Sequence, residues 1–328
     1  MAKQFDIDDY VNGIKASDKR ILGKAITLIE SKKPEHRDLA DQLLKAILPF
    51  TGKSTRVGIT GVPGVGKSTF IETFGKLAIE KGKTVAVLAV DPSSSINKGS
   101  ILGDKTRMEE LAKDPNAFIR PSPSSGFLGG IANTTYESLL ICEAAGYDYI
   151  LIETVGVGQS ETLVNDITDV FLFLKIIGGG DELQGIKRGI MEMADVIFIN
   201  KVSPENLAKA KLTKTELSRA LKFINSKEKG WKVPVILGSA LESEGLSETF
   251  EMIENFISLK NSNGTFLENR KNQAEKRFDF WVKEYILEKA KHDHLLENSY
   301  LEHKKNASEL QANSSSEARE FVQKLFEN

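Results

Sequence analysis

Cysteine and histidine are scarce in this sequence, and the shortage argues against several kinds of site. The chain has one cysteine, Cys142, so it cannot form an internal disulfide, which is typical of proteins of a reducing compartment. Cys142 stands in an apolar, helix-like segment, and we predict a buried thiol rather than a nucleophile or a metal ligand. With one cysteine and four histidines, the chain also lacks the closely spaced soft ligands of a nickel or zinc site.

Long hydrophobic runs and an excess of one charge are missing as well. No stretch approaches the roughly 18–20 apolar residues of a membrane span, and the opening MAKQFDIDDY has no apolar core of a signal peptide. Lys+Arg 44 against Asp+Glu 46 gives a net charge of −2, so nothing indicates a nucleic-acid partner or an anionic membrane. We therefore expect a cytoplasmic protein with no membrane and no nucleic-acid partner.

The strongest motif lies in the segment RVGITGVPGVGKSTF, residues 56–70. A short β-branched run passes into the phosphate-loop pattern G-x-x-x-x-G-K-[ST] and then into an amphipathic helix. Glycines allow backbone N–H groups to surround a polyphosphate at a helix N-terminus, where the helix dipole favours negative charge. Lys67 is expected to reach the outer phosphates and Ser68 to bind Mg²⁺. The predicted nucleotide-binding residues of this loop are Gly61, Val62, Pro63, Gly64, Val65, Gly66, Lys67, Ser68 and Thr69.

The remaining apolar runs predict an α/β fold with a doubly wound, mainly parallel sheet. Near-unbroken apolar stretches alternate with helix-like patterns, as expected for strands buried on both faces. In such sheets ligands bind beyond the carboxyl ends of the strands, where the polar motifs of this chain occur. Besides the strand that leads into the phosphate loop, the predicted strands cover 84–90, 118–120, 149–152, 170–177, 196–199 and 233–237.

Three segments are expected along the chain. Residues 1–50 form a helical extension, in which Ser17 is a candidate N-cap, and residues 51–260 form the phosphate-loop domain. Residues 261–328 form a helical C-terminal segment. Within it, 278–301 is predicted to be one long helix whose apolar stripe needs a partner surface, such as a second subunit.

Acidic residues follow two of the predicted strands and are candidate metal ligands. Glu153 ends a strand and precedes a glycine, which is where phosphate-loop enzymes place an acid that holds Mg²⁺. Asp91 and Asp104 flank the polar segment DPSSSINKGSILGDKTRM, which is too long for a simple connection. We expect at least one of these two aspartates to belong to the Mg²⁺ site, while the other is a candidate helix cap.

Two further strand ends match the loops with which guanine-binding proteins hold the base. Asn200-Lys201 follows a strand in the position of the Asn-Lys-x-Asp motif, and Gly238-Ser239-Ala240-Leu241 matches the second base loop. The order and spacing of these motifs after a phosphate loop favour a guanine nucleotide, GTP or GDP. The candidate base-binding residues are Asn200, Lys201, Ser203, Ser239, Ala240 and Leu241.

As a whole, the chain resembles the ArgK/MeaB group of phosphate-loop GTPases, the chaperones of adenosylcobalamin-dependent methylmalonyl-CoA mutase. The resemblance covers roughly residues 20–260 and rests on GVPGVGKST, VDPSSSINKGSILGDKTRM, RPSPSSGFLGG, IETVGVGQSE and GGGDELQGIKRGIMEMAD. It implies a Mg²⁺-dependent GTPase that dimerises through its helical C-terminal part, gates cofactor delivery and keeps the mutase active. It also implies that Asp91, Asp104 and Glu153 serve the metal and the switches, that 178–188 is a third switch facing the mutase, and that Lys187 in it leans toward the nucleotide.

Three departures from the expected patterns bear on activity. Ser203 replaces the aspartate that reads guanine N1 and N2, and the loss of a charge-assisted hydrogen bond predicts guanine preference weakened by about one or two orders of magnitude, unless the Ser203 hydroxyl or Glu205 compensates. The third switch opens with three glycines where a proline-containing version is expected. Val157 occupies the place of the water-orienting glutamine and Gln159 comes two residues late, so we predict slow hydrolysis that a partner accelerates.

Three alternatives remain open from the sequence. The first is an ATP-dependent kinase of a transport protein, although no motif nominates an acceptor-activating base apart from the switch acids. The second is a metal-insertion GTPase, which the shortage of cysteine and histidine disfavours. The third is a nucleotide-gated scaffold that binds but hardly hydrolyses, which Ser203 and Val157 favour.

Overall fold

The computed structural model describes residues 5–31, 33–89, 108–121, 128–154, 160–177, 188–224, 226–292, 296–309 and 313–327. It divides into two compact units, Met1–Phe266 and Leu267–Asn328. The predicted three-way division at 50/51 and 260/261 stays a prediction. None of the described helices combines the length and the apolar composition that a bilayer crossing requires.

The first unit is built on a parallel sheet, which confirms the predicted fold class. Its strand order is β3-β2-β4-β1-β5-β6-β7, and every described pairing is parallel. The order reverses direction at β1, so the carboxyl end of β1 lies at a switch point of the sheet. The strands are β1 (Thr55–Thr60), β2 (Val85–Ala89), β3 (Ala117–Pro121), β4 (Tyr149–Glu153), β5 (Val170–Ile176), β6 (Val196–Asn200) and β7 (Val235–Leu237).

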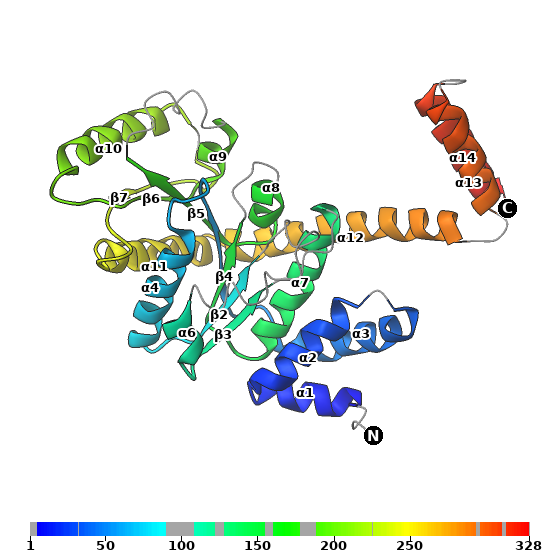
Figure 1. Cartoon of the computed structure of the whole chain (residues 1–328), viewed down its shortest axis with the longest axis horizontal. Helices are drawn as coiled ribbons and strands as arrows, with labels where there is room; N and C mark the ends of the chain where they lie inside the picture. The colour runs from blue at the N-terminus through cyan, green and yellow to red at the C-terminus, as the bar shows by residue number, and fades with distance from the viewer. Residues whose placement is uncertain are drawn as a thin grey trace. The chain divides into compact units, whose positions relative to one another are not determined.

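Helices cover both faces of this sheet (Figure 1). On β2, Val85 and Val87 belong to one hydrophobic core, whereas Ala86 and Leu88 belong to the other. Because successive side chains of a strand point to opposite faces, an unbroken apolar strand requires such cover on both sides. One core includes α4 (Lys67–Glu80) and α11 (Leu246–Ser262), and the other includes α1 (Ile7–Lys15), α2 (Lys19–Ile29), α3 (Pro34–Ile47) and α7 (Leu128–Ala144).

Shorter elements complete the first unit. They are η1 (Leu48–Phe50), α6 (Glu109–Lys113), α8 (Ser160–Asn165), α9 (Arg188–Met193) and α10 (Leu207–Leu221). Cys142 on α7 is fully buried, as predicted, and burial raises the pKa of its thiol. A buried, protonated thiol is a poor nucleophile, so its position agrees with a packing role.

The cap of α2 differs from the prediction. Asp18, not Ser17, is the N-cap, and its Oδ1 accepts hydrogen bonds from the amides of Arg20 at 2.8 Å and Ile21 at 3.1 Å. Ser17 has a positive φ of 54°, and its hydroxyl donates to the carbonyl oxygen of Ala145 at 2.6 Å. The helix therefore starts one residue later than expected, because a carboxylate satisfies two free amides of the first turn.

Three aspartates fasten the starts of the central strands. Asp148, Asp169 and Asp195 directly precede β4, β5 and β6. Each carboxylate accepts a 2.8 Å hydrogen bond from a backbone amide within one residue of the start of a neighbouring strand, namely that of Thr84, Arg56 and Phe171 respectively. These bonds tie neighbouring strand starts together at the sheet edge opposite the carboxyl ends.

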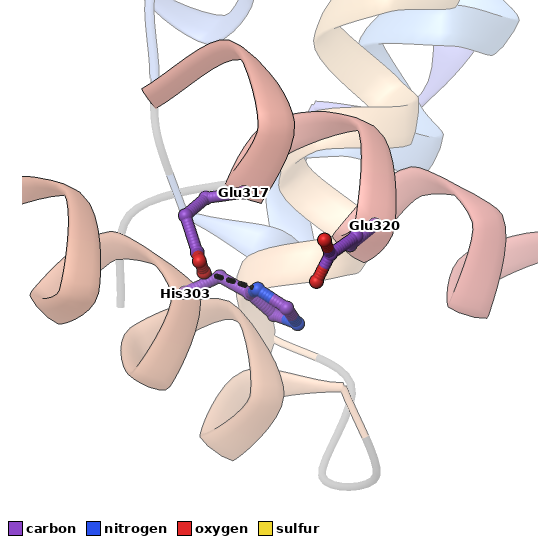
Figure 2. Close-up of side chains that lie close together, drawn as sticks. All are labelled: His303, Glu317 and Glu320. Carbon is purple, nitrogen blue, oxygen red and sulfur yellow. Dashed lines mark hydrogen bonds and ion pairs between the residues drawn. The ribbon is translucent and has the colours of Figure 1, made fainter. Parts of the chain in front are cut away.

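The second unit comprises most of α12 (Thr265–His292) with α13 (Glu297–Ser308) and α14 (Ser314–Glu327). The predicted single helix over 278–301 is wrong, because α12 ends at His292 and α13 begins at Glu297. Helices α13 and α14 pack through a Tyr300–Phe321 ring contact and a 2.6 Å hydrogen bond between His303 Nδ1 and Glu317 Oε2 (Figure 2). The apolar residues of 278–301 are thus divided between two helices.

Candidate functional site

The phosphate loop lies between the carboxyl end of β1 and the start of α4, as predicted. Two of its glycines cannot be replaced without a clash. A Cβ on Gly66, at a φ of 96°, would lie 2.8 Å from Asn200 Nδ2, and a Cβ on Gly61, at a φ of 155°, would lie 2.5 Å from the carbonyl oxygen of Leu174. The motif glycines are therefore required by close approaches from β5 and β6 as well as by backbone conformation. Of the other loop residues, Val65 is buried, Val62, Pro63 and Gly64 are exposed, and Thr69 is half-buried in the first turn of α4.

Lys67 is the buried cation of this loop. Its side chain is 8% exposed, and its Nζ donates to the carbonyl oxygens of Gly61 at 2.8 Å and Val62 at 3.4 Å. Burial lowers the pKa of Lys67, while the carboxylates of Glu153 and Glu161 act in the opposite direction. The ammonium group is thus held by loop carbonyl oxygens at the carboxyl end of β1. When a nucleotide binds, charged phosphate oxygens can replace these neutral, weaker acceptors.

Ser68 and Glu153 come together at the ends of two neighbouring strands. The Ser68 hydroxyl donates to Glu153 Oε1 at 3.3 Å, and Glu153 on β4 is in register with Ile59 on β1. A hydroxyl and a carboxylate are hard oxygen donors, the ligand types that Mg²⁺ prefers. The two residues predicted as metal ligands in this part of the chain therefore lie where one ion can contact both.

Glu161, in the first turn of α8, was not selected from the sequence. It is 3% exposed and interacts electrostatically with Lys67. In the sequence, Glu161 is the last residue of IETVGVGQSE. An acidic residue there is typical of the exposed first turn of a helix, so this pattern does not distinguish Glu161 from an ordinary surface residue. A second carboxylate besides Glu153 is therefore buried and interacts electrostatically with the phosphate-loop lysine.

Asn200 joins the base loops to the phosphate loop. Its Nδ2 donates to the carbonyl oxygen of Val65 at 2.9 Å, and its Oδ1 accepts from the amide of Ala240 at 2.9 Å. Lys201 adopts a positive φ of 62°, and its Nζ donates to the carbonyl oxygen of Gly64 at 2.7 Å. The predicted residues from three separate strand ends are thus brought into one site.

The rest of the base region consists of two tight turns. Ser203 is half-buried and opens a turn that closes at Asn206, whose amide donates to the Ser203 carbonyl at 3.1 Å. Ser239 pairs with Glu244 through reciprocal backbone hydrogen bonds of 3.2 and 3.0 Å. Leu241, between them, is 76% exposed and offers an apolar surface beside the loop.

Several predicted residues fall outside the described part of the chain. They are the metal candidates Asp91 and Asp104, the switch lysine Lys187 with 178–187, and the register positions Val157 and Gln159. Their roles stay predictions.

Comparison with known proteins gives consistent similarities. Residues 22–295 match the model of a family described as "Methylmalonyl Co-A mutase-associated GTPase MeaB". The chain is 50% identical over 277 residues to a probable GTPase of Mycobacterium tuberculosis, with 83% of this chain and 82% of that protein covered. It is 46% identical over 274 residues to the GTPase ArgK of Escherichia coli, covering 84% and 83% of the two chains.

A mammalian relative and a solved structure extend the similarity. The mitochondrial methylmalonic aciduria type A homolog of Mus musculus is 44% identical over 292 residues, which cover 86% of this chain and 70% of that protein. A crystal structure described as LAO/AO transport system kinase superposes with a TM-score of 0.77 at 34% identity, covering 98% of both chains. The similarity therefore includes the sequence, the fold and nearly the whole length of the chain.

Proposed function

Because the chain belongs to the family of methylmalonyl-CoA mutase-associated GTPases, we propose that it is a chaperone of a B12-dependent methylmalonyl-CoA mutase. The chain is a GTPase with a phosphate-loop fold. In the proposed role, its nucleotide state gates the loading of the cobalamin cofactor and protects the mutase from loss of activity. The observation that carries this proposal is the family match over 22–295, which spans all the motifs of the site.

We propose that Mg²⁺ accompanies the nucleotide. Ser68 and Glu153, 3.3 Å apart and both oxygen donors, fit the ion as neighbouring ligands, directly or through water. Asp91 and Asp104 are proposed as further members of this site. When bound, Mg²⁺ neutralises charge on the phosphates. Lys67 binds their outer oxygens, and the loop amides orient them.

We further propose that hydrolysis is slow until the mutase completes the site. The predicted third switch, 178–188, is the proposed contact, and Lys187 is its proposed catalytic contribution. The C-terminal helices of 261–328 are the proposed homodimerisation segment, and the proposed location is the cytoplasm. Together these steps would let the partner, rather than the isolated enzyme, decide when GTP is consumed.

The test mixes the purified chain with a B12-dependent mutase from the same source. Complex formation is measured by size-exclusion chromatography, and phosphate release is measured with GTP and with ATP. The expected result is a complex whose GTP turnover exceeds that of the isolated chain. Lys67→Ala is expected to abolish nucleotide binding, whereas Lys76→Ala, on the exposed face of α4, is the matched control. Absence of both a complex and stimulation would refute the chaperone role.

A kinase is the second candidate, because the superposed crystal structure is described as a transport system kinase. The same mixture distinguishes the two functions. A kinase transfers the γ-phosphate of radiolabelled ATP to protein, whereas the proposed GTPase releases it as inorganic phosphate. Stable labelling of any protein in the mixture would favour the kinase.

A further inference from the structure

The last two helices bring one histidine and two glutamates within reach of a single ion. His303 lies on α13, and Glu317 and Glu320 lie one turn apart on α14. One potential ligand atom from each side chain lies within 4.8 Å of the other two, and both carboxylates point toward the imidazole ring (Figure 2). In the part of the chain that the structure describes, no other group of three histidine, cysteine or acidic side chains comes this close together.

Two of the three side chains are buried, which is unusual for ionisable groups. His303 and Glu317 are each 8% exposed, and His303 Nδ1 donates to Glu317 Oε2 at 2.6 Å. This hydrogen bond offsets the cost of burying the pair. It does not explain why Glu320, which is exposed, turns its carboxylate to the same ring. Two carboxylates on one turn of a helix repel each other, so a shared cation best explains the arrangement.

A cavity beside the three residues gives an ion a way in. It has a volume of about 460 Å³, and His303 and Glu317 line it together with apolar side chains such as Phe321. The cavity is large enough for an ion and a water ligand. Lys283 and Lys304 also line the cavity, but both residues are exposed, so solvent screens their charges. The site therefore combines ligands with access, as a metal site requires.

The donor set indicates which ion would bind. Mg²⁺ and Ca²⁺ prefer oxygen ligands alone, whereas imidazole nitrogen suits Zn²⁺ and its neighbours in the first transition row. One imidazole and two carboxylates leave the fourth position of a tetrahedral Zn²⁺ to water. Neighbouring ligand atoms of such an ion are about 3.4 Å apart, so the 2.6 Å contact of His303 Nδ1 with Glu317 has to open by about 0.8 Å and lose its proton.

We infer that His303, Glu317 and Glu320 form a Zn²⁺ site that fastens α13 to α14. His303 and Glu317 are 14 residues apart, so the ligands do not follow the close spacing by which sequence patterns reveal zinc sites. The site lies wholly within the second unit, Leu267–Asn328. It is separate from the Mg²⁺ site proposed at the phosphate loop, and it does not depend on the proposed function.

Isothermal titration of the full chain, stripped with EDTA and free of nucleotide, tests the inference. We expect the parent to bind one equivalent of Zn²⁺ that excess MgCl₂ does not displace. Glu320→Gln is expected to weaken this binding at least tenfold, because the variant loses a ligand, and the fold should tolerate a change at an exposed residue. Glu302→Gln is the matched control. It removes an exposed carboxylate next to His303 on α13 that does not share its face, and it should leave Zn²⁺ affinity unchanged.

Co²⁺ bound in place of Zn²⁺ reports the ligands themselves. The visible absorption of four-coordinate Co²⁺ is expected in the parent and in Glu302→Gln, and it should be lost in His303→Gln, whose helices are checked by circular dichroism. Zn²⁺ should also raise the midpoint of thermal unfolding of the parent but not that of Glu320→Gln. A parent that binds no Zn²⁺ would overturn the inference, because the three residues would then form a hydrogen-bonded cluster only. Parental affinity retained in Glu320→Gln or in His303→Gln would also overturn it, because the ion would then be held elsewhere.

Discussion

The side chain of Asn200 on β6 donates a 2.9 Å hydrogen bond to the carbonyl oxygen of Val65 in the phosphate loop. Its own oxygen accepts from the amide of Ala240, so one buried amide links the three loops of the site. Both partners are backbone atoms. The link therefore depends on where β1, β6 and β7 lie in the sheet, and it couples the position of the base loops to that of the phosphate loop.

Asn200→Ala is expected to weaken GDP binding roughly 10- to 100-fold, because it leaves two buried backbone groups without partners, at about 1–3 kcal/mol each. The measurement is isothermal titration, with thermal unfolding followed in parallel. Asn263→Ala is the control, since it removes a 2.6 Å hydrogen bond to Glu228 far from the motifs. Asn263→Ala is expected to lower the stability of the fold and to leave the affinity for GDP unchanged. Equal GDP affinity of Asn200→Ala and the parent would show that the link is purely structural.

Glu161→Gln is expected to tighten GDP binding about tenfold in EDTA, because it removes a buried negative charge that interacts with Lys67 and repels the phosphates. Titration of a fluorescent GDP analogue without Mg²⁺ measures the effect. Glu80→Gln, at the exposed far end of α4, is expected to leave the affinity unchanged. Weaker binding in Glu161→Gln would instead indicate that this carboxylate helps to bind the nucleotide.

Arg56 on β1 and Glu143 on α7 form a buried ion pair, with Nε–Oε1 at 2.8 Å and Nη2–Oε2 at 2.9 Å. Glu143→Gln leaves a buried guanidinium uncompensated and is expected to cost about 3–5 kcal/mol in the free energy of unfolding. The double variant Arg56→Met, Glu143→Leu is expected to recover much of that loss. Urea unfolding measures both.

An exposed pair provides the comparison for this ion pair. Glu110→Gln breaks the 2.8 Å contact with Lys113 at the surface and is expected to leave the free energy of unfolding almost unchanged, because solvent screens this exposed pair. A double variant at Arg56 and Glu143 that is less stable than Glu143→Gln would contradict this expectation. It would show that the attraction within the ion pair exceeds the free-energy cost of burying its two charges.

Asp195 is expected to make stability fall as pH rises from about 4 to 6. Burial raises the pKa of Asp195 from 3.8 to about 6, against the opposing effects of Lys227 and the Phe171 amide. The folded state then binds this proton more tightly than the unfolded state. The stability that protonation of Asp195 contributes is therefore present below pH 4 and is lost by the time the pH passes 6. At 1.36 kcal/mol per pKa unit, the loss in the free energy of unfolding is about 3 kcal/mol.

Asp195→Asn is expected to remove this pH dependence, so its stability relative to the parent rises between pH 4 and 7. Urea unfolding can be followed by Trp231, whose Nε1 donates to the Asp195 carbonyl at 2.8 Å, in a Trp281→Phe background. A constant difference between variant and parent across this range would show that Asp195 titrates normally.

Local patterns were sufficient for the strands and the phosphate loop. The apolar runs that predicted 149–152 and 170–177 are observed as Tyr149–Glu153 and Val170–Ile176. Such runs are reliable because a strand covered on both faces has to be apolar along its whole length. The cap of α2 and the break after His292 were missed, because neighbouring residues compete for a cap and an apolar stripe does not show where a helix ends.

By itself, the sequence determined the fold class, the glycine-rich loop and the residue types at the strand ends, since these depend on short-range spacing and backbone conformation. Only the tertiary structure decided that Asn200 bonds Val65, 135 residues away, and that Glu161 is buried and interacts electrostatically with Lys67. The reason is physical. The order of strands in a parallel sheet, not proximity along the chain, selects which loops meet at its carboxyl edge.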